Sequence, residues 1–359
     1  MSMQNGRIER IQKLLESNVR VLPRGGGTKS ALSTPARDEK PLDMTGFSGM
    51  IEYIPEEFTF TAFAGTPLSE IVQILFEHGQ YLPFDPPLVE RGATLGGTVA
   101  SGLSGSGRYR FGGVRDFILG VRFIDGRGEL ISAGGKVVKN VAGYDFPKLM
   151  VGSLGGLGLL VELSFKVFPR PQAYATWLRS YERLEEALQL MKRASMAQIP
   201  LEALDLHAQN PGYTLWLRIG GISAVLPSRV SRMVEIIGEG QMLKEKDDEQ
   251  CWDQVREFSW VPEGHSLIKV ALTPRSISSL ESFLDGKPVL RRYVAGGQAA
   301  WIALDDSPRV LEPVLKDRGL SGLVIWGPPG FPRLGELRGT SFLRRVKESL
   351  DPAFRFTEV

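Results

Sequence analysis

The distribution of glycine is the feature of this sequence that most restricts how the chain can fold. The chain of 359 residues contains 41 glycines. They concentrate in its first half, in the ranges 25–27, 92–113, 126–143 and 152–158. Glycine accepts positive φ angles and lets the backbone approach a ligand closely. Four such clusters predict a long ligand that passes several backbone loops.

Length and composition set broader limits. The chain is long enough for two cores, because single cores rarely grow past about 250–300 residues. The net charge is +2 and no basic run stands out, so we expect no nucleic-acid partner. The single cysteine, Cys251, excludes a disulfide within the chain and fits a reducing, cytoplasmic compartment. We expect no signal peptide and no membrane span, because no run of about 18 apolar residues exists.

Periodicity predicts the elements of the first half. Helices are expected at 7–17 and 67–78, and strands at 19–22, 51–54, 58–64, 117–124, 129–132 and 159–168. The range 92–113 has almost no large apolar side chains, so we expect a long functional loop there. Pro169 and Pro171 mark the first domain boundary.

The second half has a different pattern with fewer glycines. Strand, helix, strand, strand and helix are expected over 175–238, and a similar order recurs over 267–327. This predicts a duplicated α+β unit. The charged run 244–249 is expected to be a solvated turn or helix end. A last helix is expected at 334–350, with Leu337, Phe342, Leu343 and Val346 on its apolar face.

The first glycine cluster follows a predicted strand. Residues 23–29 read Pro-Arg-Gly-Gly-Gly-Thr-Lys. Successive backbone N–H groups in such a loop can form a concave nest for phosphate oxygens. Arg24 and Lys29 add charge, and Thr28 adds a hydroxyl donor. Taken alone, however, a glycine triplet is more often a simple turn.

Two familiar phosphate-binding motifs do not fit this loop. A Walker A loop requires Gly-Lys-Ser/Thr, whereas Thr28 stands between Gly27 and Lys29. The dinucleotide fingerprint G-x-G-x-x-G would require glycine at the position of Ser30. A phosphate site in this loop would therefore be of another kind.

Three further segments, 93–116, 139–145 and 152–158, combine glycine with small side chains. Small residues can run close to a flat ring system and hydrogen-bond to its edge. In this order and spacing, the segments and the loop at 23–29 resemble the FAD-binding domain of the vanillyl-alcohol-oxidase/PCMH-type flavoprotein family. Within it they most resemble the FAD-binding E subunits of bacterial glycolate oxidases. The resemblance covers roughly residues 20–170.

The resemblance implies FAD as the cofactor, with the pyrophosphate against the first glycine loop. The residues that it implies in cofactor binding are Pro23, Arg24, Gly25, Gly26, Gly27, Thr28, Thr94, Gly96, Gly97, Ser101, Gly102, Gly105, Ser106, Gly113, Asp116, Asn140, Gly143, Tyr144, Gly155, Gly158 and Val161. Residues 94–102 would follow the flavin and ribityl side, and 105–116 would close over the cofactor. Residues 140–144 would lie near the ring, and 155–161 near the pyrimidine or adenine side.

The resemblance also implies an α+β fold. It divides the chain into a two-subdomain PCMH-type FAD-binding domain at 1–172 and an α+β cap at 173–332, ferredoxin-like and duplicated. A C-terminal helix at 333–359 would pack back on the FAD domain.

Departures from the family pattern refine the expectation. Some relatives attach the flavin to a His just after the glycines, where this chain has Thr28, so we expect noncovalent FAD. Related hydroxy-acid dehydrogenases carry a His-x-His metal site and a substrate-binding Arg in the cap. The only histidines here, His78, His207 and His265, are far apart in the sequence, so we expect structural roles and no metal.

Catalytic residues are not identified by the pattern. Tyr144 and Asp145 are weak candidates for a proton relay, and the alternative is packing with Asp145 as a helix N-cap. A surface role and a role at the cofactor edge are both open for Glu162.

The resemblance implies the FAD-binding subunit of a glycolate-oxidase-like oxidoreductase acting on the CH–OH group of a 2-hydroxy acid. It implies partners: a second flavoprotein subunit and an iron–sulfur subunit, since this chain has one Cys where a cluster needs about four. It also implies a cytoplasmic location, peripheral to the inner membrane through the complex. The alternatives are a noncatalytic flavin-carrying subunit for electron transfer or assembly, and a stand-alone flavin oxidase of another substrate.

Overall fold

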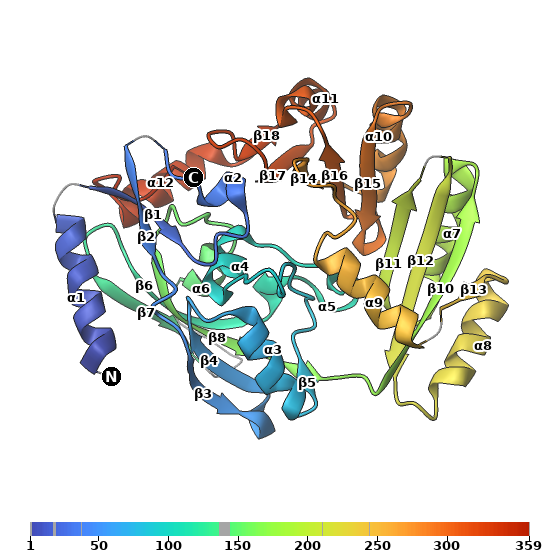
Figure 1. Ribbon diagram of the computed structural model, residues 1–359, viewed down its shortest axis with the longest axis horizontal. Coiled ribbons are helices and arrows are strands. Elements are labelled where there is room, and N and C mark those ends of the chain that lie inside the picture. Colours follow the sequence, from blue (N-terminus) through green and yellow to red (C-terminus); the bar gives the residue numbers. More distant parts are fainter. Residues whose placement is uncertain are drawn as a thin grey trace. The chain divides into compact units, whose positions relative to one another are not determined.

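The computed structural model describes residues 2–16, 19–36, 38–135, 144–209, 211–243 and 245–358. The chain divides into two compact units (Figure 1). The first unit comprises residues 1–104, 113–169 and 338–359, and the second comprises 105–112 and 170–337. The chain therefore passes between the units four times, and a short segment after residue 104 packs with the second unit.

A five-stranded antiparallel sheet forms the centre of the first unit. Its order is β3 (Met50–Ile54), β4 (Thr59–Phe63), β8 (Leu159–Lys166), β6 (Ile118–Ile124) and β7 (Leu130–Gly134). The predicted alternation along β8 is confirmed, because Val161, Leu163 and Phe165 are fully buried while Glu162 and Ser164 are half-buried. On the opposite face of β8, Glu162 forms an ion pair with Arg122 of β6, so this carboxylate has a structural partner.

Two small sheets and six helices complete the first unit. The parallel pair is β1 (Arg20–Arg24) with β2 (Glu39–Asp43), and the antiparallel pair is β5 (Gln80–Tyr81) with β9 (Phe168–Pro169). The helices are α1 (Ser2–Glu16), α2 (Ser30–Ser33), α3 (Leu68–Glu77), α4 (Leu95–Ser101), α6 (Phe146–Met150) and α12 (Thr340–Leu350). One apolar cluster joins Ile11 and Leu15 of α1 to Val21, Val161 and Phe356.

Helix α4 corrects the prediction of a continuous loop over 92–113. Thr94 caps it, since its hydroxyl accepts a hydrogen bond from the backbone N–H of Gly97 at 3.2 Å. Gly102 ends it with φ +63°. Helix propensity disfavours Gly96, but a Cβ there would lie 2.8 Å from the Ala64 Cβ. Close packing against Ala64 thus requires glycine at this position of the helix. Helix propensity alone does not predict a helix here.

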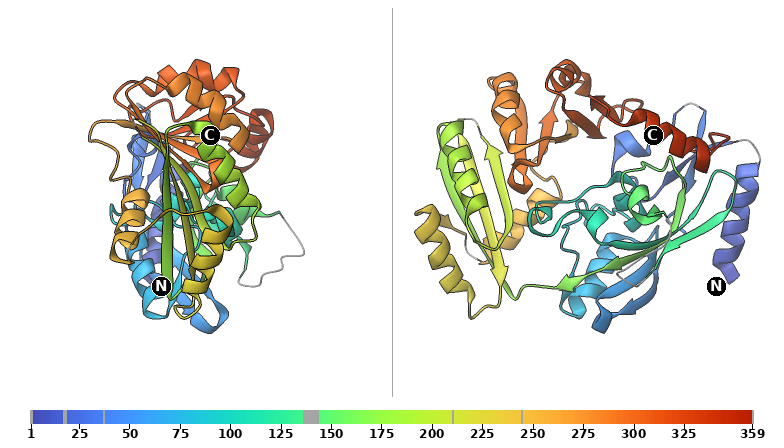
Figure 2. Two further views of the ribbon diagram at one scale, coloured as in Figure 1. Left: turned by 90° about the vertical axis from the view of Figure 1, so that its right-hand side faces the viewer. Right: turned by 180° about the vertical axis from the view of Figure 1, so that it is seen from behind.

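The second unit contains one nine-stranded sheet. The first half consists of β10 (Ala173–Tyr181), α7 (Leu184–Met196), β11 (Leu201–Ala208), β12 (Tyr213–Gly221), α8 (Leu226–Ile237) and β13 (Gln241–Met242). The second half consists of β14 (Ser266–Ala271), α10 (Ile277–Leu284), β15 (Val289–Val294), β16 (Ala299–Leu304), α11 (Glu312–Asp317) and β17 (Ser321–Trp326). Helix α7 lies along β10, β11 and β12 (Figure 2).

The two halves have the same topology. The strand order is β13-β10-β12-β11 in the first and β17-β14-β16-β15 in the second. Each is a βαββαβ unit of the ferredoxin-like type. They join through the antiparallel pair β11 and β15, and β18 (Arg333–Gly335) extends the sheet beyond β17. The predicted duplication is confirmed.

Several shorter elements connect these parts. They are the helices α5 (Arg108–Phe111) and α9 (Glu245–Arg256), and the 3-10 helices η1 (Pro55–Glu57), η2 (Val114–Asp116), η3 (Pro274–Ser276), η4 (Ala295–Gly297) and η5 (Pro308–Leu311). Within the described ranges, no helix has both the length and the apolar character needed to cross a membrane.

One element prediction for the second half is confirmed in part and another is wrong. The run 244–249 lies at a helix end, as one of its two alternatives held, because α9 begins at Glu245. It is not wholly solvated, because Asp248 is buried. Its carboxylate accepts hydrogen bonds from Thr176 and from Arg218, so a buried polar network fixes the helix. The helix expected at 334–350 begins at Thr340, because Gly339 has φ +71° and β18 precedes it. Leu337 and Phe342 are exposed rather than buried.

Candidate functional site

The glycine loop at 25–27 follows β1 directly and packs against backbone. A Cβ on Gly25 would lie 2.2 Å from the Thr94 Oγ1, and a Cβ on Gly26 would lie 1.9 Å from the Gly92 carbonyl oxygen. Gly27 has φ +65°, which side chains rarely adopt. Only glycine therefore permits this close approach to the segment that leads into α4.

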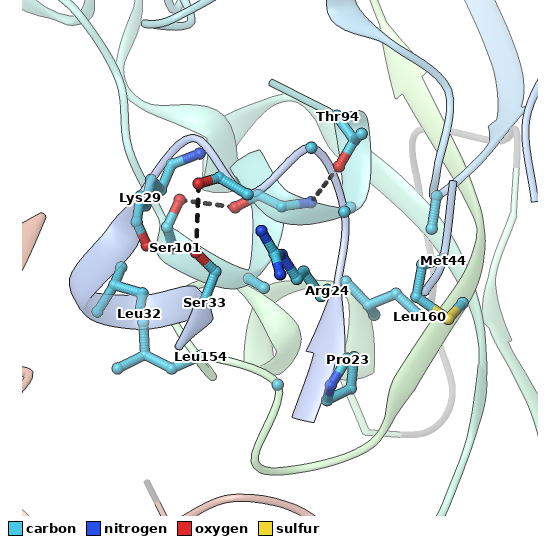
Figure 3. Close-up of a pocket in the computed structure, with 18 of the residues that line it drawn as sticks. Pro23, Arg24, Lys29, Leu32, Ser33, Met44, Thr94, Ser101, Leu154 and Leu160 are labelled. Carbon is cyan, nitrogen blue, oxygen red and sulfur yellow. Dashed lines mark hydrogen bonds between the residues drawn. The ribbon is translucent and has the colours of Figure 1, made fainter. Parts of the chain in front are cut away.

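A pocket opens beside this loop and is built from three segments of the first unit (Figure 3). It contains about 720 Å³ of empty space, part of it open to solvent. Its main walls are the glycine loop with α2, the N-cap and body of α4, and the segment 154–160, which runs into β8. Gly155, with φ +82°, leaves room for Pro23, whose Cδ would lie 3.3 Å from a Cβ at residue 155.

The lining of the pocket combines two cations with apolar side chains. Lys29 is 6% exposed, and among the described residues the one hydrogen-bond partner of its ammonium group is the Thr28 hydroxyl at 3.3 Å. Burial lowers the pKa of Lys29 from 10.5 to about 8. The Arg24 guanidinium lies close to Gly27, where a Cβ would be 2.8 Å from its Nη2. An anion in the pocket would supply the charge that these cations lack.

These residues fit a dinucleotide cofactor. Backbone N–H groups beside two cations suit a pyrophosphate. The apolar side chains of Leu32, Met44 and Leu160 suit the faces of flat rings. The donor set is therefore compatible with FAD, on the basis of the buried ammonium and the glycine-lined walls.

Many of the residues implied by the sequence line this pocket. They are Pro23, Arg24, Gly25, Gly26, Gly27, Thr28, Thr94, Gly96, Gly97, Ser101, Gly155 and Gly158. Lys29, which the sequence analysis named as a cation of the phosphate loop, lines it too. Residues not included in the prediction also line it: Leu32, Ser33, Met44, Ala64, Ala100, Leu154 and Leu160. Ala100, Leu154 and Leu160 are sequence neighbours of predicted residues. Met44 and Ala64 have no motif of their own and reach the pocket only through the fold.

Other implied residues do not line the pocket. Gly102 ends α4, and Val161 points into the core with no exposure. Asp116 accepts a hydrogen bond from the Gly113 backbone at 2.8 Å and caps η2. Gly105 and Ser106 belong to the second unit, where Ser106 donates to Asp205. Any part of these residues in cofactor binding stays a prediction.

The third implied segment is only partly described. Asn140 and Gly143 lie outside the described residues. Tyr144 is 85% exposed. Asp145 is the N-cap of α6, as the alternative prediction held, and its carboxylate contacts the Lys148 ammonium at 2.7 Å. This contact lowers the pKa of Asp145, which favours the ionised form and makes it a weak proton donor.

The three histidines occupy separate structural positions. His78 follows α3, and its Nδ1 lies 3.0 Å from the Ile74 carbonyl oxygen. His207 is buried on β11 with its ring 4.4 Å from that of Trp216, and burial lowers its pKa well below the usual value. A buried His207 is therefore neutral. Among the residues that the structure describes, no group of three or more His, Cys, Asp and Glu side chains is arranged to hold a metal ion.

One face of the second unit's sheet carries a row of cations that the sequence did not suggest. In the register of the sheet, Arg292 of β15 lies opposite Trp301 of β16, which lies opposite Lys269 of β14. Directly opposed residues of an antiparallel sheet share a face. Arg292 and Lys269 are therefore one strand apart on one face, and we call them the cationic pair.

The cationic pair forms no close ion pair with a carboxylate of the described residues. The Nη1 of Arg292 is buried without a hydrogen-bond partner among them. Burial and the charge of Arg108 lower the pKa of Lys269 to about 8. Burial lowers the pKa of Arg292 to about 10, although the charge of Asp205 acts in the opposite direction. The Nε of Arg108 is also buried and unpaired. This face of the second unit is therefore suited to an anion.

Comparison with known proteins agrees with these features. Residues 8–134 match FAD_binding_4, the FAD binding domain family. The chain is 38% identical over 251 residues to glycolate oxidase subunit GlcE of Escherichia coli (strain K12), a match that covers 70% of this chain and 67% of GlcE. It is 31% identical to glycolate oxidase subunit GlcD of Bacillus subtilis (strain 168), covering 53% of this chain and 41% of GlcD.

More distant relatives extend the pattern. A D-2-hydroxyglutarate dehydrogenase of Xanthomonas citri pv. viticola is 30% identical, over 56% of this chain and 43% of that protein. The chain thus spans less than half the length of this relative and of GlcD. A solved structure of alkyldihydroxyacetonephosphate synthase superposes on 98% of this chain and 75% of its own with a TM-score of 0.71 at 15% identity, which establishes the fold alone.

The expected fold class is therefore confirmed, with a PCMH-type first part and a duplicated α+β second part. The chain belongs to the FAD-binding oxidoreductase family of VAO/PCMH type that includes the glycolate oxidase subunits GlcE and GlcD.

Proposed function

We propose that this chain is the FAD-binding subunit of an oxidoreductase that converts a 2-hydroxy acid such as glycolate to the 2-oxo acid. The observation that carries the proposal is the cationic pair, Arg292 and Lys269, in a chain of a flavoprotein family. Two cations on one face of the sheet, without a close ion pair to a carboxylate of the described residues, suit the carboxylate that every 2-hydroxy acid carries.

We assign the cofactor to the pocket of the first unit. The pyrophosphate of FAD would lie against Arg24, Lys29 and the glycine loop, and the rings would lie toward α4 and the loop 154–160. Thr28 offers no ring nitrogen for a covalent link, so the attachment is noncovalent. Acid or heat treatment of the purified protein would release FAD into the supernatant, and colour in the precipitate would contradict noncovalent binding.

The division of labour follows from the chemistry. Bound FAD supplies the two-electron acceptor for the hydride from C2 of the hydroxy acid. The chain's own residues bind and orient: the glycine loop and Lys29 hold phosphate oxygens, and the cationic pair holds the substrate carboxylate.

We further propose that the chain works with a second flavoprotein subunit and an iron–sulfur subunit. Two of its relatives, GlcE of Escherichia coli and GlcD of Bacillus subtilis, are each named as a glycolate oxidase subunit, and Cys251 alone cannot bind an iron–sulfur cluster. The proposed domains are 1–172 for FAD, 173–332 for the cap, and 333–359 for the C-terminal helix. We propose a cytoplasmic location, peripheral to the inner membrane through the partners, which fractionation of cells with and without a salt wash would test.

One experiment tests the activity. Glycolate or D-lactate is added without oxygen to the FAD-loaded chain, alone and with its partner subunits, and the flavin absorbance near its visible maximum is followed. Loss of the band with the chain alone supports the proposal and excludes a noncatalytic subunit. Loss that requires a partner, and persists when the cationic pair is replaced, assigns the chemistry to the partner. No loss under any condition contradicts a 2-hydroxy acid as the substrate.

A further inference from the structure

The C-terminal segment 338–359 belongs to the first unit, and one buried lysine is its central contact. Lys347 of α12 is 4% exposed. Its ammonium lies 2.7 Å from the Gly156 carbonyl oxygen and 2.7 Å from the Asp351 Oδ2. The carbonyl oxygens of Phe356 and Thr357 each lie 3.0 Å from it. A single side chain thus joins four oxygens, more than the three hydrogens of an ammonium group can serve separately.

One of these contacts reaches the wall of the cofactor pocket. Gly156 is a neighbour of Gly155, which lines the pocket and packs on Pro23, and it lies two residues before Gly158, which also lines the pocket. The Gly156 carbonyl accepts a buried hydrogen bond from the Lys347 ammonium. The position of the loop 154–158 therefore depends on an interaction from the far end of the sequence.

The other contacts reach the strand that carries the glycine loop. The backbone N–H of Val21 in β1 donates to the Arg355 carbonyl at 2.7 Å, and Val21 pairs with Phe356 as a parallel bridge. The Phe356 side chain is fully buried in the cluster that contains Val21 and Val161. Because β1 leads directly into residues 25–29, the same C-terminal residues support both the phosphate loop and the loop opposite it.

Asp351 holds this arrangement in place. Its carboxylate accepts from the backbone N–H groups of Arg355 at 2.7 Å and Phe356 at 2.9 Å, besides contacting Lys347. Gly126 leaves no space beside it, since a Cβ there would lie 2.2 Å from the Asp351 Oδ1. The backbone N–H of Gly126 donates to the Leu350 carbonyl at 2.8 Å. The ion pair is thus buried, hydrogen-bonded and fixed from two sides.

We propose that Lys347 is a positioning residue of the cofactor pocket, which sets the separation of the loop 154–158 from the glycine loop and so determines the affinity for FAD. Lys347 does not line the pocket itself. It acts on the two walls through the Gly156 carbonyl and through the residues that pair with β1. The inference depends on FAD binding in this pocket and not on the identity of the hydroxy acid.

The test compares FAD affinity with fold stability. In Lys347→Met the apolar stem remains and the four oxygens lose their donor. Apo-protein is titrated with FAD, and the dissociation constant is read from flavin fluorescence while the melting temperature of the apo-protein is measured separately. We expect a dissociation constant about tenfold higher, the size of one lost hydrogen bond to a charged group. Lys347→Gln retains an amide donor and is measured in parallel, with an intermediate value expected.

A matched control separates positioning from general destabilisation. Phe60→Leu enlarges a buried site of the same unit at a residue that does not line the pocket. We expect it to lower the melting temperature without changing the dissociation constant for FAD. The inference would be overturned if Lys347→Met bound FAD as tightly as wild type. It would also be overturned if Lys347→Met and Phe60→Leu had similar melting temperatures and equal affinities for FAD.

A double-mutant cycle addresses the route of the effect. Gly155→Ala displaces the loop directly, because Gly155 has φ +82°. If Lys347 acts through this loop, the combined variant binds FAD more tightly than the product of the two single effects predicts. Effects that simply multiply would overturn the inference. A wild-type chain that binds no FAD would instead contradict the cofactor assignment itself, so the two failures are distinguishable.

Discussion

Lys29 is the residue at which burial, charge and ligand chemistry meet. Its ammonium is buried beside a glycine loop, and the Thr28 hydroxyl is its one partner among the described residues. Burial without a counter-charge is unfavourable unless the group loses its proton or gains an anion. The lowered pKa reflects the first outcome and a bound phosphate would provide the second.

The affinity for FAD is expected to fall as pH rises above about 8. The folded apo-protein holds the pKa of Lys29 at about 8 instead of 10.5, so its stability rises with pH between these values as the folded state binds fewer protons. Binding of an anion requires the ammonium form, so affinity moves in the opposite direction, by up to about tenfold per pH unit. FAD titrations from pH 6 to 10 measure this.

Lys29→Met provides the control for this pH dependence. It removes the titrating group, so the dissociation constant should be higher at pH 7 and nearly constant with pH. A wild-type affinity that does not change between pH 7 and 10 would show that Lys29 is not in contact with the cofactor's phosphates.

Gly26 tests how tightly the glycine loop packs. In Gly26→Ala the new Cβ would lie 1.9 Å from the Gly92 carbonyl oxygen, so one of the two backbone segments must move. We expect a loss of FAD binding of at least about a hundredfold, because the nest of backbone donors is displaced. Equilibrium dialysis with FAD measures it.

Gly6→Ala is the matched control for Gly26→Ala. Gly6 lies in α1, and no atom lies within 4 Å of its added Cβ. Alanine in a helix is favoured over glycine by roughly 0.5–1 kcal/mol, so FAD affinity should stay unchanged and stability should not fall. Equal FAD binding by both alanine variants would contradict a role for the loop's close packing.

At the level of elements, helix α9 shows how a charged segment becomes part of the core. Asp248 is buried beneath Arg218, and Trp252 of the same helix donates to Thr176, which also bonds to Asp248. Asp247 and Glu249 on the same helix are exposed. Among these three acidic residues, Asp248 alone faces inward. The position of the sheet determines this, and the sequence does not show it.

Asp248→Ala is expected to destabilise the second unit by about 3 kcal/mol, because it leaves Arg218 without its carboxylate partner. Urea unfolding followed by tryptophan fluorescence, to which Trp252 contributes, measures the change. Asp247→Ala alters an exposed carboxylate one residue away and should change stability by less than about 0.5 kcal/mol. Similar losses in the two variants would contradict the buried network.

The elements that the sequence predicted well are those with strong local patterns. The alternation of β8 and the helix α3 followed from residue spacing, and both halves of the second unit followed from the recurring order of strands and helices. Helix α4 was missed because its glycines oppose helix formation locally and are selected by contact with Ala64. The start of α12 was predicted too early. The apolar spacing begins before Gly339, whereas the helix begins only after this residue.

For the whole molecule, the division into two units separates two binding chemistries. The pocket of the first unit is lined by glycine and cations for a dinucleotide, whereas the second unit presents the cationic pair on its sheet. The chain crosses between units at residues 104–105 and 112–113, so the segment that follows α4 is held by the second unit through Ser106 and Arg110.

Replacement of the cationic pair is expected to separate cofactor binding from substrate binding. Arg292→Met and Lys269→Met should leave the FAD content unchanged and raise the concentration of hydroxy acid needed to reduce the flavin by about tenfold or more each. Stopped-flow absorbance at varied glycolate or D-lactate measures this. Arg275→Met, which removes an exposed cation of the same unit, is the control and should behave as wild type.

The sequence by itself determined the order of the parts, and its resemblance to a flavoprotein family implied the cofactor. Glycine is required where backbone approaches backbone or ligand, so its clustering is visible without coordinates, and glycines of three of the four clusters line the pocket. The duplication of the second unit was likewise predicted from the recurring order of strands and helices. These features are local in sequence, which is why spacing and composition reveal them.

Only the tertiary structure decided which charged residues have partners. The sequence does not show the surroundings of three of the lysines. In the structure, Lys29 lies in a pocket, Lys269 shares a sheet face with Arg292, and Lys347 joins four oxygens. Met44 and Ala64 reach the pocket from segments with no motif. Burial and pairing depend on contacts between residues far apart in the chain, and those contacts exist only after the sheets have formed.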